Sequence, residues 1–524
     1  MCGITLLLNN TTSGLRKLTH RGPDDHNEVH VRGHTMVFDR LAINDGSDKG
    51  RQPFCIQNTW SMCNGEIYNH RMLKQVHDII TDGKSDCEVV HHLLLQNKMT
   101  NLNQCFRELD GDFAFVFVSD NHVIVARDPM GVRPLYVAWN EHREVIGFAS
   151  EAKAFDQAHE VTHFPPGHYW CNNTLVSYQP LPLSLPIQTP ETDRGMVTNK
   201  IRILLYESIF KRIQNTDRSI GFLLSGGLDS SIIASVAAKI FHPNKIDTYS
   251  IGTLSVSDKD SPDLIAAQQV ADHIGSNHHV IRYSPAQLLD RVETVVHAIE
   301  SYDCTTVRAS VPMYLLAEFI SKETNHKVVL SGEGADELFG GYLYFHNAPD
   351  ETAFQEETVR LCRDVHTHDV LRADRCTAAH GLELRVPFFD KSLVEYVLSI
   401  DPSLKFPGTS ANKGVEKMIL REAFQDHLPE NIVVRQKNGM SDAVGYDWVD
   451  HVRTWCARHA ESHSADSERW HLNVPMTPEE SYYRTLYEAT YGHLNLRSID
   501  HVWRPRWTEE TDPSARALSH FKSD

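Results

Sequence analysis

The 524-residue chain lacks the sequence features of a secreted, membrane-spanning or nucleic-acid-coating protein. No apolar run approaches the roughly 18 residues that a membrane span needs, and the first ten residues carry no basic segment leading into a secretory apolar stretch. No block of like charge occurs, and 51 Lys and Arg against 69 Asp and Glu give a net charge of −18. Because a phosphate-neutralising surface needs surplus basic residues, we expect no nucleic-acid partner. The missing membrane span and secretory segment lead us to expect no membrane association and a cytoplasmic location.

Patterns for structural metals and disulfides are also missing. The 10 cysteines are scattered without repeated close pairs, which does not suit a disulfide framework. The 31 histidines form neither a zinc-type Cys/His spacing nor a His-Glu-x-x-His motif. We therefore expect neither a disulfide scaffold nor a structural zinc site.

The composition is that of an ordinary globular protein, with 41% hydrophobic and 23% charged residues. The length alone allows about three domains. Between residues 179 and 193 the periodic apolar pattern stops and four prolines occur, which is typical of a linker. We therefore predict two large domains, residues 2–185 and 195–510, joined by this segment; its prolines are Pro180, Pro182, Pro186 and Pro190.

The part before the linker is rich in predicted strands. Short apolar runs at 113–118 and 122–126 are separated by Asp120-Asn121, which predicts a hairpin. Residues 88–95 have apolar side chains at helical spacing after Ser85-Asp86, which predicts a helix.

Beyond the linker, predicted strands alternate with predicted helices. Such a series predicts a parallel sheet covered by helices, with ligands at the carboxyl ends of the strands. From about residue 364 onward the sequence is mostly helical. The expected strands are 220–224, 247–251, 279–283 and 327–330, and the clearest helices are 231–241 and 262–275.

Cys2 is the first candidate for chemistry. Loss of Met1 would give Cys2 a free α-amine, a group whose ordinary pKa is about 8, able to act as base for its own thiol. A Met-Cys start taken alone would more often be a buried strand residue. The nearby segments 21–25, 40–43, 64–69 and 85–88 supply a guanidinium, an amide donor and carboxylates. These groups could hold a zwitterionic amino acid and stabilise an oxyanion.

A second candidate is the segment 224–231, LSGGLDSS, between a predicted strand and a predicted helix. Its glycines and hydroxyls, followed by a helix N-terminus, can surround an anion. It lacks the Gly-Lys-Ser/Thr ending of a Walker motif, and a plain flexible turn is the alternative. The strand–loop–helix context favours a pyrophosphate cradle.

A third candidate, the acidic loop after the strand 327–330, contains Glu333, Asp336 and Glu337. Its carboxylates suit Mg²⁺ or a base for an incoming amine, although solvated acidic turns are common. A further polar set could neutralise substrate carboxylate and phosphates, but any one of its charges alone would more often be a surface charge. That set is Thr305, Thr306, Arg308, Arg385 and Lys437.

An ordered series of motifs resembles the glutamine-hydrolysing asparagine synthetases of the asparagine synthetase B type. The similarity runs from Met1 to at least Trp448. Two departures are Asn44, where a valine is usual, and Asn438-Gly439, where the family has an acidic residue after Lys437. The motifs are MCGI, RGPDD, RLAI, NGEIYNH, SDCEV, RDPMGVRPLY, FPPGHY, LLSGGLDSS, TTVRAS, LSGEGADELFGGYLYFH, RVPFFD and RQK.

This resemblance implies a two-domain fold and a reaction. The N-terminal domain would be a class II glutamine amidotransferase with the αββα N-terminal-nucleophile sandwich. The C-terminal domain would be a parallel-sheet α/β ATP pyrophosphatase of the PP-loop type with a helical C-terminal part. The enzyme would make asparagine from aspartate, through β-aspartyl-AMP, with ammonia from glutamine. It would use ATP and Mg²⁺ and release AMP, pyrophosphate and glutamate; a homodimer is left open.

The resemblance also implies roles for residues of the N-terminal domain. Cys2 would attack the glutamine amide, and Asn64 with the Gly65 N–H would form the oxyanion hole. Arg40 would hold the glutamine α-carboxylate and Asp86 its α-ammonium. The glutamine pocket would comprise Arg40, Leu41, Ala42, Ile43, Asn44, Asn64, Gly65, Glu66 and Asp86.

In the C-terminal domain, Glu333 matches the residue linked to intermediate formation and ammonia deprotonation, and Arg308 is a further catalytic candidate. Thr305, Thr306 and Arg308 would bind aspartate. Asp229 and Asp336 would bind the metal. The ATP-binding positions would be Leu223, Ser225, Gly226, Gly227, Asp229, Ser230, Ile251, Ser331, Gly332 and Lys437.

Three other interpretations make different demands on the sequence. A β-lactam-forming synthetase would lack the working N-terminal cysteine, whereas Cys2 is present. A non-catalytic regulator would be expected to have lost Cys2, Glu333 or part of SGGLDS, and all are present. A phosphoribosyl-type amidotransferase would share only the first domain.

Overall fold

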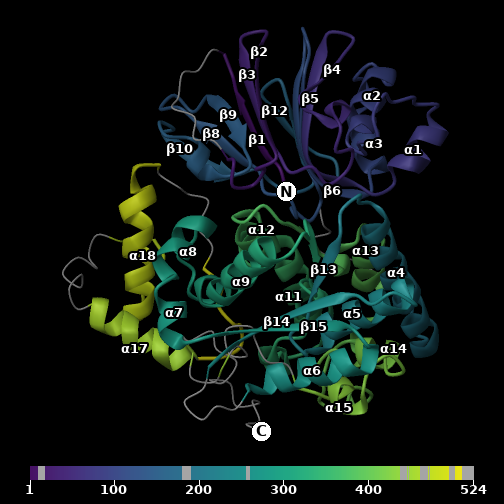
Figure 1. Ribbon diagram of the computed structural model, residues 1–524, viewed down its shortest axis with the longest axis vertical. Helices are drawn as coiled ribbons and strands as arrows, with labels where there is room; N and C mark the ends of the chain where they lie inside the picture. The colour runs from purple at the N-terminus through teal and green to yellow at the C-terminus, as the bar shows by residue number, and fades with distance from the viewer. Residues whose placement is uncertain are drawn as a thin grey trace.

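The computed structural model describes residues 1–9, 18–179, 191–254, 260–436, 445, 448–460, 470, 472–494 and 502–509. Figure 1 shows a β-rich N-terminal body above a larger C-terminal body in which helices surround a third sheet. The prolines of the predicted linker, and Lys437, Asn438 and Gly439, lie outside the described residues.

The N-terminal body contains two six-stranded antiparallel sheets. One has the order β10-β8-β9-β1-β3-β2, and the other has the order β12-β11-β7-β6-β5-β4. The predicted hairpin is confirmed as β6 paired with β7. The strands are β1 Gly3–Leu7, β2 Asp25–Val31, β3 His34–Arg40, β4 Phe54–Ile56, β5 Thr59–Ile67, β6 Gly111–Val118, β7 Val123–Arg127, β8 Tyr136–Trp139, β9 Val145–Ala149, β10 Glu160–His163, β11 His168–Cys171 and β12 Thr174–Ser177.

Strand alternation explains the layers of this body. In β6, Ala114 and Val116 face the first sheet, whereas Phe113 and Phe115 face the helices, because successive side chains point to opposite faces. The outer face of the first sheet packs against the short 3-10 helix η2, Ala152–Ala154. The expected sandwich is therefore confirmed. Its helices are α1 His70–Val76, α2 Glu88–Gln96 and α3 Leu102–Glu108.

The C-terminal body is built on a parallel five-stranded sheet with the order β15-β14-β13-β16-β17. The order reverses between β13 and β16, so the loops after these two strands open onto a topological switch point, where ligands bind in such sheets. The four expected strands are confirmed, and β17 was not predicted. The strands are β13 Ile220–Leu223, β14 Asp247–Thr253, β15 Asn277–Tyr283, β16 Val328–Leu330 and β17 Glu383–Arg385.

Local signals set the helix ends. In α6, Ser261 caps Leu264 N, proline occupies the first turn, and Gly275 ends the helix in the left-handed conformation. None of the helices in the described ranges is long and apolar enough to cross a membrane. The helices are α4 Arg194–Gln214, α5 Leu228–Phe241, α6 Pro262–Ile274, α7 Pro285–Leu289, α8 Val292–Ile299, α9 Cys304–Glu323, α10 Ala335–Phe339, α11 Glu351–Asp364, α12 Asp369–Ala378, α13 Lys391–Ser399, α14 Met418–Ala423, α15 Glu430–Val433, α17 Trp448–Ala460 and α18 Pro478–Tyr491.

Candidate functional site

Cys2 lies at the start of β1, facing the loop that follows β3. Its thiol donates a hydrogen bond to Leu41 O at 3.6 Å, and Leu41 N donates to the Cys2 sulfur at 3.4 Å. Burial raises the pKa of the Cys2 thiol, so the thiol needs a base before it can act as a nucleophile. The structure therefore places Cys2 beside the predicted glutamine segment 40–44.

Met1 fills the space next to Cys2. It is buried, Arg133 approaches its sulfur at 2.7 Å, and it packs with apolar side chains of both bodies. Burial lowers the pKa of its α-ammonium group to about 6. The Met1 α-amine is thus in surroundings that favour its neutral form.

Asn64 on β5 has the geometry of an unused donor. Its side chain is completely buried, and neither atom of its carboxamide has a hydrogen-bond partner among the described residues. Gly65 has φ +150°, and a Cβ there would lie 2.0 Å from Asp112 O, so only glycine fits. Because buried polar groups are nearly always satisfied, Asn64 is an apt donor for a ligand oxygen.

Glu66 and Asp86 form a buried pair of carboxyl groups in the predicted glutamine pocket. Burial, and then the neighbouring Asp86 carboxylate, raise the pKa of Glu66 well above its usual range. Ile67 N donates to Asp86 at 2.6 Å. Arg40 is also buried, and its guanidinium donates to the carbonyls of Asp45 and Ser47. The structure therefore brings Glu66 and Asp86 together around the Asn44 amide, whereas the Arg40 guanidinium is engaged by carbonyls of its own loop.

This pocket is in direct contact with the C-terminal body. The Arg385 guanidinium lies 3.3 Å from Glu66 and donates to Glu383 at 2.8 Å. Asn215, at the end of α4, donates to Glu66 at 2.6 Å and to Asp86 at 3.1 Å. The side chain of Arg385, suggested above for substrate carboxylate or phosphate, is thus engaged by carboxylates at the domain junction.

The segment 224–231 has the compact shape expected of an anion cradle. The Ser225 and Ser230 hydroxyls lie 3.1 Å apart, and Ser230 Oγ accepts from Ser225 N at 3.2 Å. Gly226 has φ +76°, and a Cβ on it would clash with Ala267 N at 2.4 Å. A Cβ on Gly332 would lie 2.7 Å from Ser230 N, so the two glycine-rich loops are in close contact.

Lys417 links the two predicted metal ligands. Its ammonium donates to Asp229 at 2.7 and 2.9 Å and to Asp336 at 2.7 Å. The Lys417 side chain is buried, whereas the two carboxylates keep slight exposure to solvent. Asp229 follows β13 and Asp336 follows β16, so the switch point brings them together. The two carboxylates therefore converge on a single cation position beside the cradle.

Glu333 lies in an ion-pair network rather than in isolation. Arg372 donates to Glu333 at 3.0 Å and to Asp369 at 2.7 Å. Tyr342 donates to Asp369 and Glu337 at 2.8 and 2.6 Å. The network fixes the Glu333 carboxylate within the second glycine-rich loop, the one that follows β16.

The residues predicted for aspartate lie at the N-terminal end of α9. They differ in how far their polar groups are already paired within the protein. Thr306 bonds the capping residue Asp303 through both its N–H and its hydroxyl. Arg308 forms a buried two-point ion pair with Glu479 of α18, at 2.7 and 2.6 Å. The Thr305 hydroxyl is buried and has no partner within the described ranges.

Comparisons with protein families and with relatives agree across the whole chain. Residues 200–353 and 347–507 match the family described as asparagine synthase, and residues 1–170 match the glutamine amidotransferase domain. Glutamine-hydrolysing asparagine synthetases of Homo sapiens and Mus musculus are 37% and 38% identical, covering 100% of this chain and 99% of theirs. The chain belongs to the asparagine synthase family.

Similarity to solved structures is much weaker. A glutamine phosphoribosylpyrophosphate amidotransferase from B. subtilis is 15% identical, covers 55% of this chain and 92% of its own, and has a TM-score of 0.31. Membership of the asparagine synthase family therefore rests on the sequence comparisons alone.

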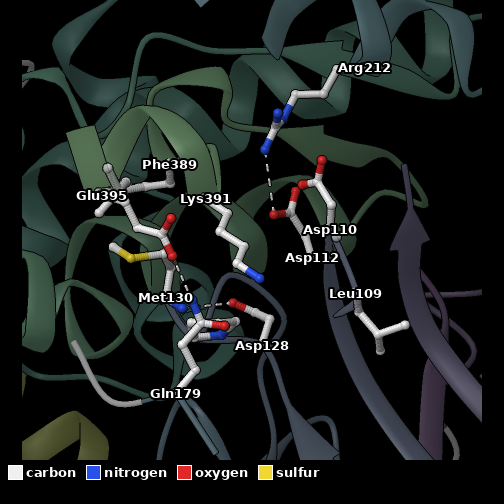
Figure 2. A pocket seen from close by; sticks show the side chains of 13 residues that line it. Leu109, Asp110, Asp112, Asp128, Met130, Gln179, Arg212, Phe389, Lys391 and Glu395 are labelled. Carbon is white, nitrogen blue, oxygen red and sulfur yellow. Dashed lines mark hydrogen bonds and ion pairs between the residues drawn. The ribbon is translucent and has the colours of Figure 1, made fainter. Parts of the chain in front are cut away.

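Figure 2 shows a pocket of this family member at the domain junction. Asp110, Asp112 and Asp128 line it from the N-terminal side, and Arg212, Lys391 and Glu395 from the C-terminal side. Arg212 pairs with Asp112 at 3.6 Å, and Gln179 donates to Glu395 at 2.8 Å. No residue predicted for glutamine, aspartate or ATP lines this pocket.

Four residues of this synthase escaped the sequence reasoning. They reach the site through tertiary contacts and lie outside the motifs predicted from the sequence. Lys417 carries no signal except its charge, and Asn215 follows an ordinary helix. The four are Asn215, Arg372, Lys417 and Glu479.

Proposed function

We propose that this chain makes asparagine from aspartate and ATP with ammonia that it releases from glutamine. One observation carries the proposal. A single chain combines a cysteine directly after Met1, a buried and unpartnered amide at Asn64, and an anion cradle at a switch point. Membership of the asparagine synthase family, at 37% identity over the full chain, agrees with this activity.

The first step uses Cys2 after loss of Met1. The α-amine of Cys2 takes the thiol proton, and the sulfur attacks the amide carbon of glutamine. The oxyanion that forms is held by Asn64 Nδ2 and the Gly65 N–H. The C–N bond then breaks, the proton goes to the leaving nitrogen, and ammonia departs. Water hydrolyses the thioester to glutamate and restores the thiol.

Removal of Met1 also vacates space beside Cys2. Arg133 contacts both Met1 and the carbonyl of Leu384 on β17, so the vacated volume borders the C-terminal domain. The surroundings of that volume are buried, which keeps ammonia released there away from bulk water.

The second step activates aspartate. Its β-carboxylate oxygen attacks the α-phosphorus of ATP, and the bond to the bridging oxygen breaks, so that pyrophosphate leaves. Ammonia then attacks the carbonyl carbon and AMP leaves with its electron pair. Ser225, Gly226, Gly227 and Ser230 hold the phosphates, with Lys437 assigned to the same group. Leu223, Ile251, Ser331 and Gly332 line the adenosine side.

Glu333 is assigned the proton of the attacking ammonia. Arg372 donates to this carboxylate at 3.0 Å and holds it in place. Thr305, Thr306 and Arg308 are assigned to aspartate, with the unpartnered Thr305 hydroxyl as the donor best placed to serve a ligand. Arg308 would meet aspartate only through rearrangement or sharing of its pair with Glu479.

Mg²⁺ fits the donor chemistry of Asp229 and Asp336. Both carboxylates hold the Lys417 ammonium and keep slight exposure to solvent beside the cradle, and carboxylate oxygens are the ligands this ion prefers. When bound, Mg²⁺ would neutralise charge on the departing pyrophosphate. We expect Asp336→Ala to raise the Mg²⁺ concentration needed for half-maximal synthesis; an unchanged Mg²⁺ profile would remove Asp336 as a ligand.

The division into domains at residues 2–185 and 195–510 completes the proposal. A homodimer and a cytoplasmic location stay predictions from the sequence.

The decisive test is Cys2→Ala, with the exposed Cys55→Ala as matched control. We expect Cys2→Ala to lose glutamine-dependent formation of asparagine and AMP while keeping ammonia-dependent synthesis. The control should keep both activities. Loss of both activities in a folded Cys2→Ala protein, or retention of both, would contradict the two-site reaction.

A further inference from the structure

The amide nitrogen of Asn44 lies among three oxygens in the glutamine pocket. It donates to Glu66 Oε2 at 2.7 Å and lies 3.3 Å from both Asp86 Oδ1 and the carbonyl of Asn215. A carboxamide nitrogen has two hydrogens, whereas a primary ammonium has three. Three acceptors, two of them on carboxyl groups, form a position that suits an ammonium better than an amide.

The two carboxyl groups do not depend on Asn44 for their placement. The Asn215 carboxamide donates to both Glu66 and Asp86, at 2.6 and 3.1 Å. Ile67 N donates to Asp86, and Arg385 approaches the other oxygen of Glu66 at 3.3 Å. Withdrawal of the Asn44 side chain would therefore leave an assembled anionic site.

Charge balance points the same way. Glu66 and Asp86 are buried side by side, and the pKa of Glu66 is raised by burial and by Asp86. The neutral Asn44 amide adds no positive charge to that of Arg385 beside Glu66, whereas a cation between the two carboxyl groups would offset their repulsion directly. The ligand that suits the site carries a positive nitrogen with three donors, as the α-ammonium of an amino acid does.

The backbone around Asn44 is fixed, so only its side chain is able to move. Arg218 Nε donates to Ala42 O at 2.7 Å. Asp217 N donates to Ile43 O at 3.2 Å, and Asp45 N donates to the Asp217 carboxylate at 3.1 Å. These contacts pin residues 42–45 to the segment just before β13. Asn44 itself is only half-buried, which leaves its side chain room to rotate.

We propose that the Asn44 carboxamide occupies the α-ammonium position of the glutamine site and has to rotate away before glutamine binds. Asn44 is thus a specificity-determining residue that weakens glutamine binding without contacting the reacting amide. The inference rests on the proposed glutaminase function of Cys2.

The test compares glutamine with its des-amino analogue 5-amino-5-oxopentanoate, which has the same amide but no α-ammonium. In Met1-processed enzyme we expect Asn44→Val and Asn44→Ala to lower the KM for glutamine by about tenfold, the worth of one charge-assisted hydrogen bond. The KM for the analogue and ammonia-dependent synthesis should not change. Asn27→Ala, which removes a half-buried asparagine on β2, is the matched control.

Other results would overturn the inference. Equal changes for glutamine and the analogue would mean that Asn44 acts through packing alone. A rise in KM for glutamine only would mean that Asn44 binds the substrate, and no change would mean that it does not compete. A fault in the proposed function gives a different pattern, because glutamine hydrolysis would then persist in Cys2→Ala. Ammonia-dependent synthesis reports folding of every variant.

Discussion

Arg21 of the N-terminal domain forms a buried two-point ion pair with Asp374 of the C-terminal domain, at 2.8 and 3.1 Å. The same guanidinium donates to Glu151 at 2.7 Å and, through Nε, to the carbonyl of Cys2 at 3.0 Å. One side chain therefore connects the backbone of the nucleophile to α12 of the other domain. The position of Cys2 and the contact between the domains depend on the same charge.

Asp374→Asn should loosen both the position of Cys2 and the contact between the domains. Removing one partner of a buried ion pair costs about 3 kcal/mol, so we expect a lower thermal midpoint. Ammonia should then escape at the junction, and the ratio of glutamate to asparagine formed should rise. Asp426→Asn is the control, because its partner Arg202 holds it in an exposed pair. An unchanged product ratio with a lowered midpoint would limit Asp374 to stability.

Asn64→Ala should reduce glutaminase turnover specifically. Loss of one oxyanion donor typically lowers kcat by about 10²- to 10³-fold, because the donor acts mainly on charge in the transition state. The KM for glutamine should change little, and ammonia-dependent synthesis should be retained. Asn121→Ala, at the exposed turn between β6 and β7, is the control. A large rise in KM with unchanged kcat would instead make Asn64 a ground-state binding residue.

Lys417→Met should damage the synthetase site and spare the glutaminase. Without the ammonium, Asp229 and Asp336 repel each other, and breaking such a buried arrangement costs about 3 kcal/mol. We expect ammonia-dependent synthesis to fall sharply while glutamine hydrolysis without ATP persists. The double variant Lys417→Met, Asp336→Asn should regain stability but not synthesis. Full synthesis in the single variant would show that Lys417 is dispensable.

Lys405→Met tests a buried charge far from any motif. The Lys405 amine is fully buried with one hydrogen bond, to Val397 O, and burial lowers its pKa to about 7. Between about pH 7 and pH 10 the unfolded chain holds this proton and the folded chain does not, so the stability of the native protein rises with pH over that window. Below this pH window, the free-energy cost of burying the Lys405 amine has its full value.

We therefore expect Lys405→Met to be more stable than the native protein near pH 7, by on the order of 3 kcal/mol. The difference should shrink toward pH 10. Thermal unfolding followed across this pH range measures it, with the exposed Lys200→Met on α4 as control. A constant difference at every pH would mean that the gain comes from packing and not from the charge.

Local patterns were sufficient for much of the architecture. The β6–β7 hairpin follows from two short apolar runs on either side of Asp120-Asn121, and α6 follows from Ser261, Pro262 and Gly275 at its ends. β17 was missed because its sequence, Glu-Leu-Arg, has charged residues on both sides of one leucine and shows no apolar run, unlike the equally short β16. Its place at the sheet edge depends on pairing with β16, a partner more than fifty residues away.

The sequence by itself determined the chemistry available to this protein, because Cys2, SGGLDSS and the acidic loop carry their reactive groups within a few residues. Tertiary structure alone decided how those groups are neutralised and connected. Lys417 reaches two aspartates across a switch point, Arg21 ties Cys2 to Asp374, and Asn44 meets Glu66 and Asp86 together with Asn215. Such contacts join residues far apart in the chain, and burial sets their strength, so no local sequence pattern predicts them.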